Sequence, residues 1–321
     1  MNRANEAFAE LGVPMDPNKQ EGPSTSLVYI GYTLNTVNMT IGTSGKQREK
    51  LLPLLDTALG QSITIDDLEK LIGKLGFISL PVRLGQSYLF YTRRELYAAL
   101  EKKPSSTPTH RWHVHLRANS KNELRWWKAA VAADVTTPIS LHIDWPSSAP
   151  IIEVWTDACE WGCGAIWGSS HLSLEWSQTI REITGIRTQT HRNMPLCEAI
   201  AVAVAVSTGR NQFAGKRVRL HTDCTAVVAG VNKGRASVQA SEWLHATYRF
   251  INQICCESGI DLRAVHIKGT NNVYADLLSR NQMEQFQTLA EQHSLRVSPA
   301  QVLPIVIQPT LQEPSITFPT A

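Results

Sequence analysis

The order of strand-like and helix-like segments between residues 151 and 281 is the feature that most constrains the fold of this chain. In chain order, the segments are strands at 151–156, 162–168 and 172–176, a helix at 195–208, a strand at 218–222, helices at 226–231 and 237–258, a strand at 262–267 and a helix at 272–281. Apolar, β-rich runs mark the strands, and apolar residues at helical spacing mark the helices. Because this order combines hairpins with βα crossovers, we expect an α/β fold with a mixed five-stranded sheet flanked by helices.

The residues before this α/β part, which we place at 150–282, follow a different pattern. Residues 1–43 contain short strands and turns, and residues 44–145 are expected to be mostly helical, with helices at 45–59, 64–80, 87–100 and 119–133. Ser44 is a candidate cap of the first helix, and Thr64 with Asp67 forms a capping signal for the second. The tail, residues 283–321, is rich in Pro and Thr towards its end, and we expect it to be disordered.

The length of 321 residues is sufficient for two domains with separate cores. No run of eighteen apolar residues occurs, so we expect no membrane span. The N-terminus MNRANEAFAELG lacks the apolar core of a signal peptide, and we expect an intracellular protein, in the cytoplasm or nucleus. The six cysteines lie in the second half without a CxxC pair, which favours buried free thiols over a zinc site.

The net charge of +3 is unevenly distributed along the chain. Residues 70–128 hold 12 Lys/Arg against 3 Asp/Glu, whereas the remainder holds 19 basic and 25 acidic residues. The basic segment also contains seven aromatic residues: Tyr88, Phe90, Tyr91, Tyr97, Trp112, Trp126 and Trp127. Interleaved basic and aromatic residues suit a nucleic-acid track. The same composition fits a solvated helix face whose aromatics lie in the core, and this feature alone does not separate the two interpretations.

Four carboxylates stand where the surrounding sequence is apolar. Asp157 ends the strand IIEVWTD, and Asp223 ends VRLHTD in the same way. Glu198 opens the apolar helix LCEAIAVAVAV, and Asp276 lies one turn into a helix that follows a strand. Taken singly, Asp223 could cap the next helix and Asp157 could anchor a turn. Four acids at the ends of one sheet indicate more, because mutually repelling carboxylates are tolerated when divalent cations bind between them.

The motifs around these acids resemble those of a known family. TDACEWGCGA, the Glu in LCEAIAV, HTDCTAVV and HIKGTNNVYADLLSR are similar, in order and spacing, to the four motifs of the type 1 ribonuclease H domain of retroelement reverse transcriptases. The resemblance covers about residues 150–282 and is nearest to DIRS-like (tyrosine-recombinase) retrotransposons. It implies a ribonuclease H-like fold and a metal-dependent endonuclease that cuts the RNA strand of RNA–DNA hybrids. By the same resemblance, Asp157, Glu198, Asp223 and Asp276 are the catalytic residues and hold two Mg²⁺ ions, for which Mn²⁺ can substitute.

The resemblance extends to the N-terminal half. Residues 8–36 resemble the end of a reverse-transcriptase palm, and residues 44–145 resemble the thumb and connection, so 1–43 would be a partial palm. The palm's catalytic YxDD sequence is absent. We therefore expect no polymerisation by this chain alone, and a polymerase part supplied upstream or in trans is an expected partner. A hybrid that runs from the acids towards the basic helical segment would place its phosphate backbone near five residues: Lys70, Lys74, Arg83, Arg93 and Arg94.

The sequence departs from the family at two places. Many members carry a His in the loop before the last acid, whereas the loop here is KGTNNVY, and His266 on the preceding strand is expected to pack. Turnover could be slower, or another group could serve. The family also places an Asn shortly before the helix Glu. Asn193 is near that position, although Pro195 intervenes, and we treat it as a candidate contact to the hybrid.

Two other functions remain open from the sequence. A non-catalytic module could keep the fold and bind nucleic acid, which the incomplete palm and the loop without His favour. A transposase or integrase of the same superfamily would use three acids at different spacings, and the Glu at the start of the first helix argues against it.

Overall fold

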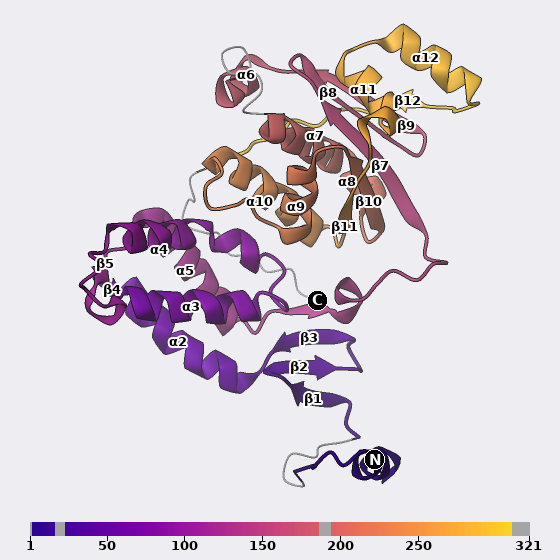
Figure 1. Cartoon of the computed structure of the whole chain (residues 1–321). Coiled ribbons are helices and arrows are strands. Elements are labelled where there is room, and N and C mark those ends of the chain that lie inside the picture. Colours follow the sequence, from indigo (N-terminus) through magenta and orange to yellow (C-terminus); the bar gives the residue numbers. More distant parts are fainter. Residues whose placement is uncertain (1, 17–22, 186–193, 310–321) are drawn as a thin grey trace.

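The chain folds into a mostly helical N-terminal part and an α/β C-terminal part, which pack against each other in the computed structural model (Figure 1). The structure describes residues 2–16, 23–185 and 194–309. None of the helices within these described residues is long and apolar enough to cross a membrane.

The α/β part is built on one mixed sheet. Its strands are β7 (Ile151–Ala158), β8 (Gly162–Trp167), β9 (Ser170–Glu175), β10 (Arg217–Thr222), β11 (Asp261–His266) and β12 (Ser298–Pro299). They lie in the order β11-β10-β7-β8-β9-β12. β7, β8 and β9 form an antiparallel meander, whereas β10 lies parallel to both β7 and β11. The α/β fold with a mixed sheet flanked by helices that we expected from the sequence is confirmed, but the sheet has a sixth strand, β12, parallel to β9.

Helices cover both faces of this sheet. The helices are α6 (Gln178–Thr184), α7 (Met194–Thr208), α8 (Arg210–Phe213), α9 (Thr225–Lys233), α10 (Glu242–Glu257), α11 (Val273–Ser279) and α12 (Met283–Gln292). α7 is apolar on every side because it packs between the sheet and α10, so nearly its whole length is buried. α11 contacts β7, β8 and β9, and residues of α11 and α12 form a separate small core with Trp155 and Ile166.

The N-terminal part combines helices with a second small sheet. Its helices are α1 (Asn2–Glu10), α2 (Gly45–Leu59), α3 (Ile65–Ile78), α4 (Phe90–Lys102) and α5 (Ala118–Ala132). The antiparallel sheet has the order β1-β2-β3-β6, formed by β1 (Ser26–Tyr29), β2 (Tyr32–Asn35), β3 (Thr40–Thr43) and β6 (Thr136–Pro138). A short pair, β4 (Ile63–Thr64) with β5 (His113–Val114), closes the helical end. The helices share a core of leucines with Trp126 and Trp127.

The local capping predictions had different outcomes. The hydroxyl of Thr64 accepts a hydrogen bond from the backbone N–H of Asp67 (3.1 Å) and caps α3 as predicted. Ser44 is the cap residue of α2, but its side chain makes no capping hydrogen bond. Four of the described helices were not predicted, namely α1, α6, α8 and α12, because all four are short and lack a long apolar stripe.

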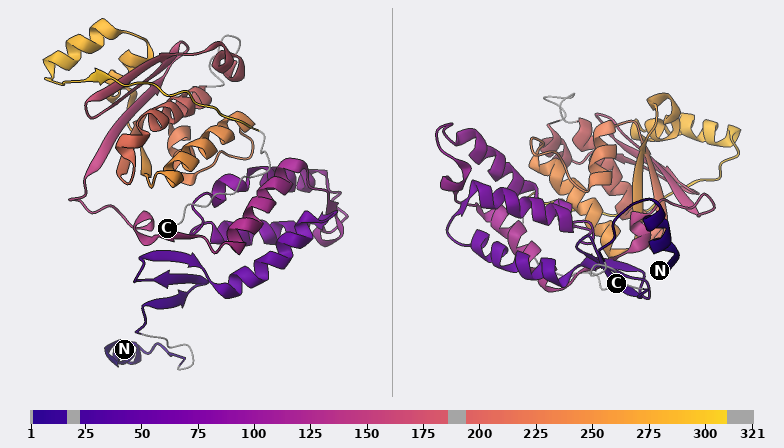
Figure 2. Two further views of the ribbon diagram at one scale, coloured as in Figure 1. Left: turned by 180° about the vertical axis from the view of Figure 1, so that it is seen from behind. Right: turned by 60° about the horizontal axis from the view of Figure 1, so that its bottom comes forward.

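The disordered tail expected from the sequence is wrong for residues 283–309. This segment forms α12 and β12, and Val302, Ile305 and Ile307 then pack against the main core of the α/β part. Figure 2 shows the segment in yellow as it crosses the α/β part towards the helical part. Alternate apolar residues in a Pro-containing stretch supply enough buried surface to hold an extended chain against the helices. Residues 310–321 lie outside the described residues.

The aromatic residues of the basic segment mostly belong to cores. Phe90 and Tyr91 are part of the main core of the α/β part, and Phe90 stacks on His245 of α10 with ring centroids 4.1 Å apart. Trp126 and Trp127 belong to the helical core, whereas Tyr97 is exposed. The interpretation of this segment as helices with core aromatics is therefore correct for most of these rings. Its consequence is that α4 joins the two parts into a shared interior.

Candidate metal centre

Three of the four predicted acids meet at one edge of the main sheet. Asp157 ends β7 and Asp223 directly follows β10. The two strands are parallel neighbours with Trp155 opposite His221, so their carboxyl ends lie at the same edge. Glu198 lies in the second turn of α7, which packs against β7. One carboxylate oxygen from each of Asp157, Glu198 and Asp223 lies within 4.8 Å of the others.

The cluster is a costly arrangement for free carboxylates. Asp157 and Glu198 are buried, at 7% and 6% exposure, whereas Asp223 is exposed. Burial, together with the charges of Asp157 and Asp223, raises the pKa of Glu198 to about 9. Burial also raises the pKa of Asp157 to about 6. Close packing of acids whose charged forms are disfavoured is typical of functional sites rather than of structural ion pairs.

The donor set fits a hard divalent cation. Within the described residues, the Oε2 atom of Glu198 is buried and has no hydrogen-bond partner. An unpartnered buried carboxylate oxygen carries a large desolvation cost that a cation would offset. All three ligand atoms are carboxylate oxygens, which Mg²⁺ and Mn²⁺ prefer to nitrogen or sulfur. Three of the four acids expected from the sequence are thus placed so that they fit one divalent cation.

Asp276 lies beside this cluster but outside the three-acid group. It sits in the first turn of α11, and its Oδ1 accepts a hydrogen bond from Nε of Arg280 (2.8 Å). Its charge is one of the causes that raise the pKa of Asp157, after burial, so the two carboxylates are neighbours. Among the described residues, Asp157, Glu198 and Asp223 form the one group of three or more potential ligands close enough to share an ion, and Asp276 is not part of it.

The position of α11 depends on Gly164. A Cβ atom on Gly164 would lie 2.5 Å from the carbonyl oxygen of Ala275 and from the backbone nitrogen of Ser279, so only glycine lets the helix approach β8 this closely. The approach brings the hydroxyl of Ser279 to Asp157, where it donates a hydrogen bond to Oδ2 (2.7 Å). Asn272, just before α11, donates to the carbonyl of Thr156 (2.9 Å) and fixes the start of the helix.

Ser279 and Asn272 were not singled out from the sequence. Both lie in the segment HIKGTNNVYADLLSR that carries the resemblance, so that motif was the available signal. Their partners, Asp157 and a strand carbonyl, are more than 110 residues away in the chain. Local pattern alone therefore gave no means of assigning them to the site.

The prediction that His266 packs is wrong. Its side chain is exposed, and Nε2 lies 3.1 Å from the backbone carbonyl oxygen of Asp223. The strand ends at this residue, so its side chain reaches the neighbouring strand end instead of the interior. The loop that follows contains Gly269, where a Cβ would lie 2.8 Å from Oδ2 of Asp223.

The predicted nucleic-acid contacts fall into three groups. Asn193 lies outside the described residues. Lys70 and Lys74 are exposed one turn apart on α3, and Lys70 pairs with Asp66 (2.6 Å). The three arginines, Arg83, Arg93 and Arg94, all make contacts within the chain.

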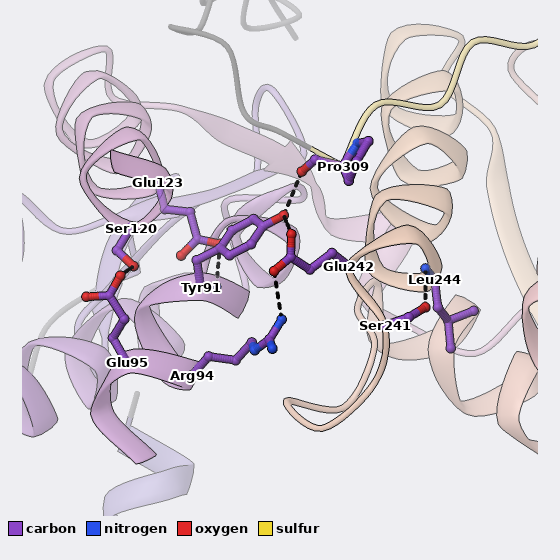
Figure 3. A network of polar contacts seen from close by, with 9 residues as sticks. All are labelled: Tyr91, Arg94, Glu95, Ser120, Glu123, Ser241, Glu242, Leu244 and Pro309. Atoms are coloured by element: carbon purple, nitrogen blue, oxygen red, sulfur yellow. Dashed lines mark hydrogen bonds and ion pairs between the residues drawn. The ribbon is translucent and has the colours of Figure 1, made fainter. Parts of the chain in front are cut away.

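Those arginine contacts mostly join the two parts of the protein. Arg83 donates to the backbone carbonyls of Cys255 (3.1 Å) and Ile260 at the end of α10. Arg94 pairs with Glu242 of α10 (3.1 Å), as Figure 3 shows. Arg93 donates to Gln86 (3.0 Å), and burial lowers its pKa to about 10. Each guanidinium therefore has a structural partner.

The six cysteines are free thiols, as expected from their spacing. Cys159, Cys163, Cys197 and Cys255 are buried. Burial raises the pKa of Cys197 to about 12, which disfavours the thiolate that a zinc site would need.

Comparisons with known proteins give distant structural similarities. A scan against protein-family models finds no match, and a search of curated proteins finds no relative in sequence. The crystal structure of ribonuclease H1 from the halophilic archaeon Halobacterium salinarum NRC-1 is similar over 42% of this chain and 99% of that protein, with 12% identity and a TM-score of 0.32.

Two structures of the foamy viral protease-reverse transcriptase with double-stranded DNA are also similar to this chain. Each match covers 76% of this chain, with 9% identity and TM-scores of 0.29 and 0.30. This chain spans 38% and 45% of the length of those two chains. Similarity at this level does not establish an activity, so the functional argument depends on the geometry of the acids.

Proposed function

We propose that this chain is a metal-dependent endonuclease that cleaves the RNA strand of RNA–DNA hybrids, of the kind found in the C-terminal part of retroelement reverse transcriptases. The observation that carries the proposal is the group formed by Asp157, Glu198 and Asp223, with a buried, unpartnered oxygen on Glu198. The sequence motifs around these acids and Asp276 resemble the ribonuclease H domain of DIRS-like retrotransposons, which supports this substrate class.

The four acids have distinct roles in this proposal. Asp157, which groups with Glu198 and Asp223 and whose pKa is also raised by the charge of Asp276, is the candidate ligand shared by two ions. Glu198 and Asp223 would complete one site, and Asp276 would complete the other. When bound, two Mg²⁺ or Mn²⁺ ions would supply Lewis-acid activation of a water and stabilisation of the leaving 3′ oxygen.

The residues around the acids prepare them for this chemistry. The hydroxyl of Ser279 orients Asp157 through its hydrogen bond to Oδ2. Burial of Asp157 and Glu198 keeps bulk water from two of the ligands, which strengthens electrostatic interactions at the cluster. We expect products with 5′ phosphate and 3′ hydroxyl ends, and the 2′-hydroxyl of RNA would distinguish the cut strand.

Hybrid cleavage by the purified chain tests this proposal. Wild type should cut the RNA strand of a labelled hybrid in Mg²⁺ and lose the activity when EDTA is added. Asp157→Asn should remove the activity while leaving the fold intact, because the replacement keeps size and removes the charge that a cation needs. Glu160→Gln, next to the cluster in sequence but exposed, is the matched control. Equal cleavage by wild type and Asp157→Asn would refute the assignment.

A second candidate is a nucleic-acid-binding module without catalysis. The observation that favours it is the loop before Asp276, which lacks the His that many family members carry. If the chain is such a module, wild type and Asp157→Asn bind the hybrid equally well, and the hybrid remains intact in Mg²⁺ and in Mn²⁺. A polymerase part supplied upstream or in trans, and an intracellular location, belong to both candidates.

A further inference from the structure

A groove on the helical part is lined by basic residues that the candidate metal centre does not use. It has a volume of about 530 Å³ and lies between α4, the segment 112–119 and the first residue of α10. Its walls carry five cationic or titratable basic side chains: Arg94, Lys102, His113, His115 and Arg117. Glu242, the first residue of α10, also lines the groove, so the groove borders the α/β part.

The two acids in the groove already have partners within the chain. Glu95 accepts hydrogen bonds from the backbone N–H of Arg117 (3.0 Å) and the hydroxyl of Ser120 (2.7 Å), at the start of α5. Glu242 pairs with Arg94 (3.1 Å), and the hydroxyl of Tyr91 donates to the same carboxylate (3.4 Å). Figure 3 shows the contact of Ser120 with Glu95 and the contacts of Arg94 and Tyr91 with Glu242. The groove therefore keeps a net positive charge.

The groove contains two of the few Lys and Arg side chains of the basic segment that have no partner within the described residues. Eight of the twelve Lys and Arg side chains between residues 70 and 128 make a hydrogen bond or ion pair: Lys70, Arg83, Arg93, Arg94, Lys103, Lys121, Arg125 and Lys128. Within the described structure, Lys74, Lys102, Arg111 and Arg117 have none. Two of these four line the groove, and Arg111 precedes Trp112 in its wall.

The exposed cationic side chains in the groove suit recognition of the phosphates of an extended ligand better than recognition of protein carboxylates. Lys102 and Arg117 are exposed and lie on opposite walls, on α4 and on the segment before α5. His113 and His115 are also exposed, but their rings already contact the hydroxyl of Ser62 (3.3 Å) and the carbonyl oxygen of Gln61 (2.9 Å), so they are not assigned to the ligand. Spaced cations on an open groove track a sugar–phosphate backbone and carry no base readout.

We propose that this groove binds the phosphate backbone of nucleic acid through Lys102 and Arg117, as a second contact surface away from the acids. The proposal rests on the proposed function, because that function makes nucleic acid the ligand of the chain. It differs from the contacts predicted from the sequence, because neither Lys102 nor Arg117 was among them, and both side chains are without a partner in the part of the chain that the structure describes. Binding in the groove is independent of sequence and sensitive to salt.

The test measures how strongly binding of an RNA–DNA hybrid depends on salt. Fluorescence anisotropy is recorded over a series of NaCl concentrations, in an Asp157→Asn background so that the hybrid stays intact. Lys102→Gln with Arg117→Gln should weaken binding and lower the slope of log K against log salt by about two, since each lost phosphate contact removes roughly one. The matched control, Lys50→Gln with Arg296→Gln, removes the same charge from exposed positions outside the groove and should leave the slope unchanged.

The outcomes separate the groove from the nuclease. An unchanged slope in the groove variant, or an equal loss in the control variant, overturns the groove. Cleavage is measured separately, on the chain with Asp157 intact. A reduced salt slope in the groove variant supports phosphate binding in the groove even if the chain with Asp157 intact cuts no hybrid. Absence of cleavage by that chain would refute the proposed function instead. Thermal unfolding of each variant checks that the exposed substitutions leave the fold unchanged.

Discussion

Glu123 is a fully buried carboxylate whose removal tests the electrostatic reasoning on this fold. It lies on α5, and its oxygens accept hydrogen bonds from the backbone N–H groups of Tyr91 (3.0 Å) and Thr92 (2.8 Å) and from the hydroxyl of Thr92 (2.7 Å). It therefore closes the start of α4, beside the contacts shown in Figure 3. Burial raises its pKa to about 7, and these hydrogen bonds offset part of that effect.

The direction of the pH dependence follows from the raised pKa. The folded protein holds the Glu123 proton more tightly than the unfolded chain, whose glutamate titrates near 4.5. The contribution to stability is therefore complete below about pH 4.5 and is lost as the pH rises through about 7. Raising the pKa from 4.5 to about 7 corresponds to roughly 3 kcal/mol of unfolding free energy lost across that window.

Glu123→Gln removes this titration while keeping the size of the side chain. Urea unfolding, followed by tryptophan fluorescence of α5, gives the free energy of unfolding of both proteins between about pH 5 and pH 8. We expect wild type to lose roughly 2.5 kcal/mol relative to Glu123→Gln over this range, because pH 5 already lies above the pKa of the unfolded chain. Glu101→Gln, an exposed glutamate on α4, should follow wild type at every pH. A difference between wild type and Glu123→Gln that does not change with pH would refute the reasoning.

Three further changes test how the two parts and the acids are held. Arg83→Ala should lower the melting temperature and speed proteolysis between the two parts, because it removes two hydrogen bonds to carbonyls at the end of α10; unchanged proteolysis would contradict this. Gly164→Ala should destabilise the protein by about 1 to 3 kcal/mol and reduce hybrid cleavage, since the new Cβ displaces α11; calorimetry and the cleavage assay measure both. Truncation after Ser294 should lower the melting temperature by several degrees because it removes β12 and buried apolar residues, whereas a free tail would have no effect.

The acids could be predicted from the sequence because each contradicts its local pattern. A carboxylate at the end of an apolar strand, as at Asp157 and Asp223, or at the start of an apolar helix, as at Glu198, costs desolvation energy unless something compensates it. The parallel pairing of β7 with β10 then follows from the order of strands and helices. The positions of these three residues in the sequence were therefore enough to select them and to predict that they lie at the same edge of the sheet.

The sixth strand and the ordered tail could not be predicted in the same way. β12 is two residues long and contains Pro299, so no alternating pattern marks it. The strand exists because β9 offers an unpaired edge to which residues 298–299 bind. The strand with which such a segment pairs depends on the assembled fold, so the local sequence does not predict it.

The arginines show why charge alone is a weak guide to binding residues. Arg83, Arg93 and Arg94 were assigned to phosphate because they lie in a basic segment, yet each has a partner within the chain. The sequence shows where positively charged residues occur, whereas the fold determines which of their side chains already have an ion pair or a hydrogen bond. Lys102 and Arg117 have the same local composition around them and keep their charges free. A basic surface is therefore better identified by subtracting the partnered side chains than by counting lysines and arginines.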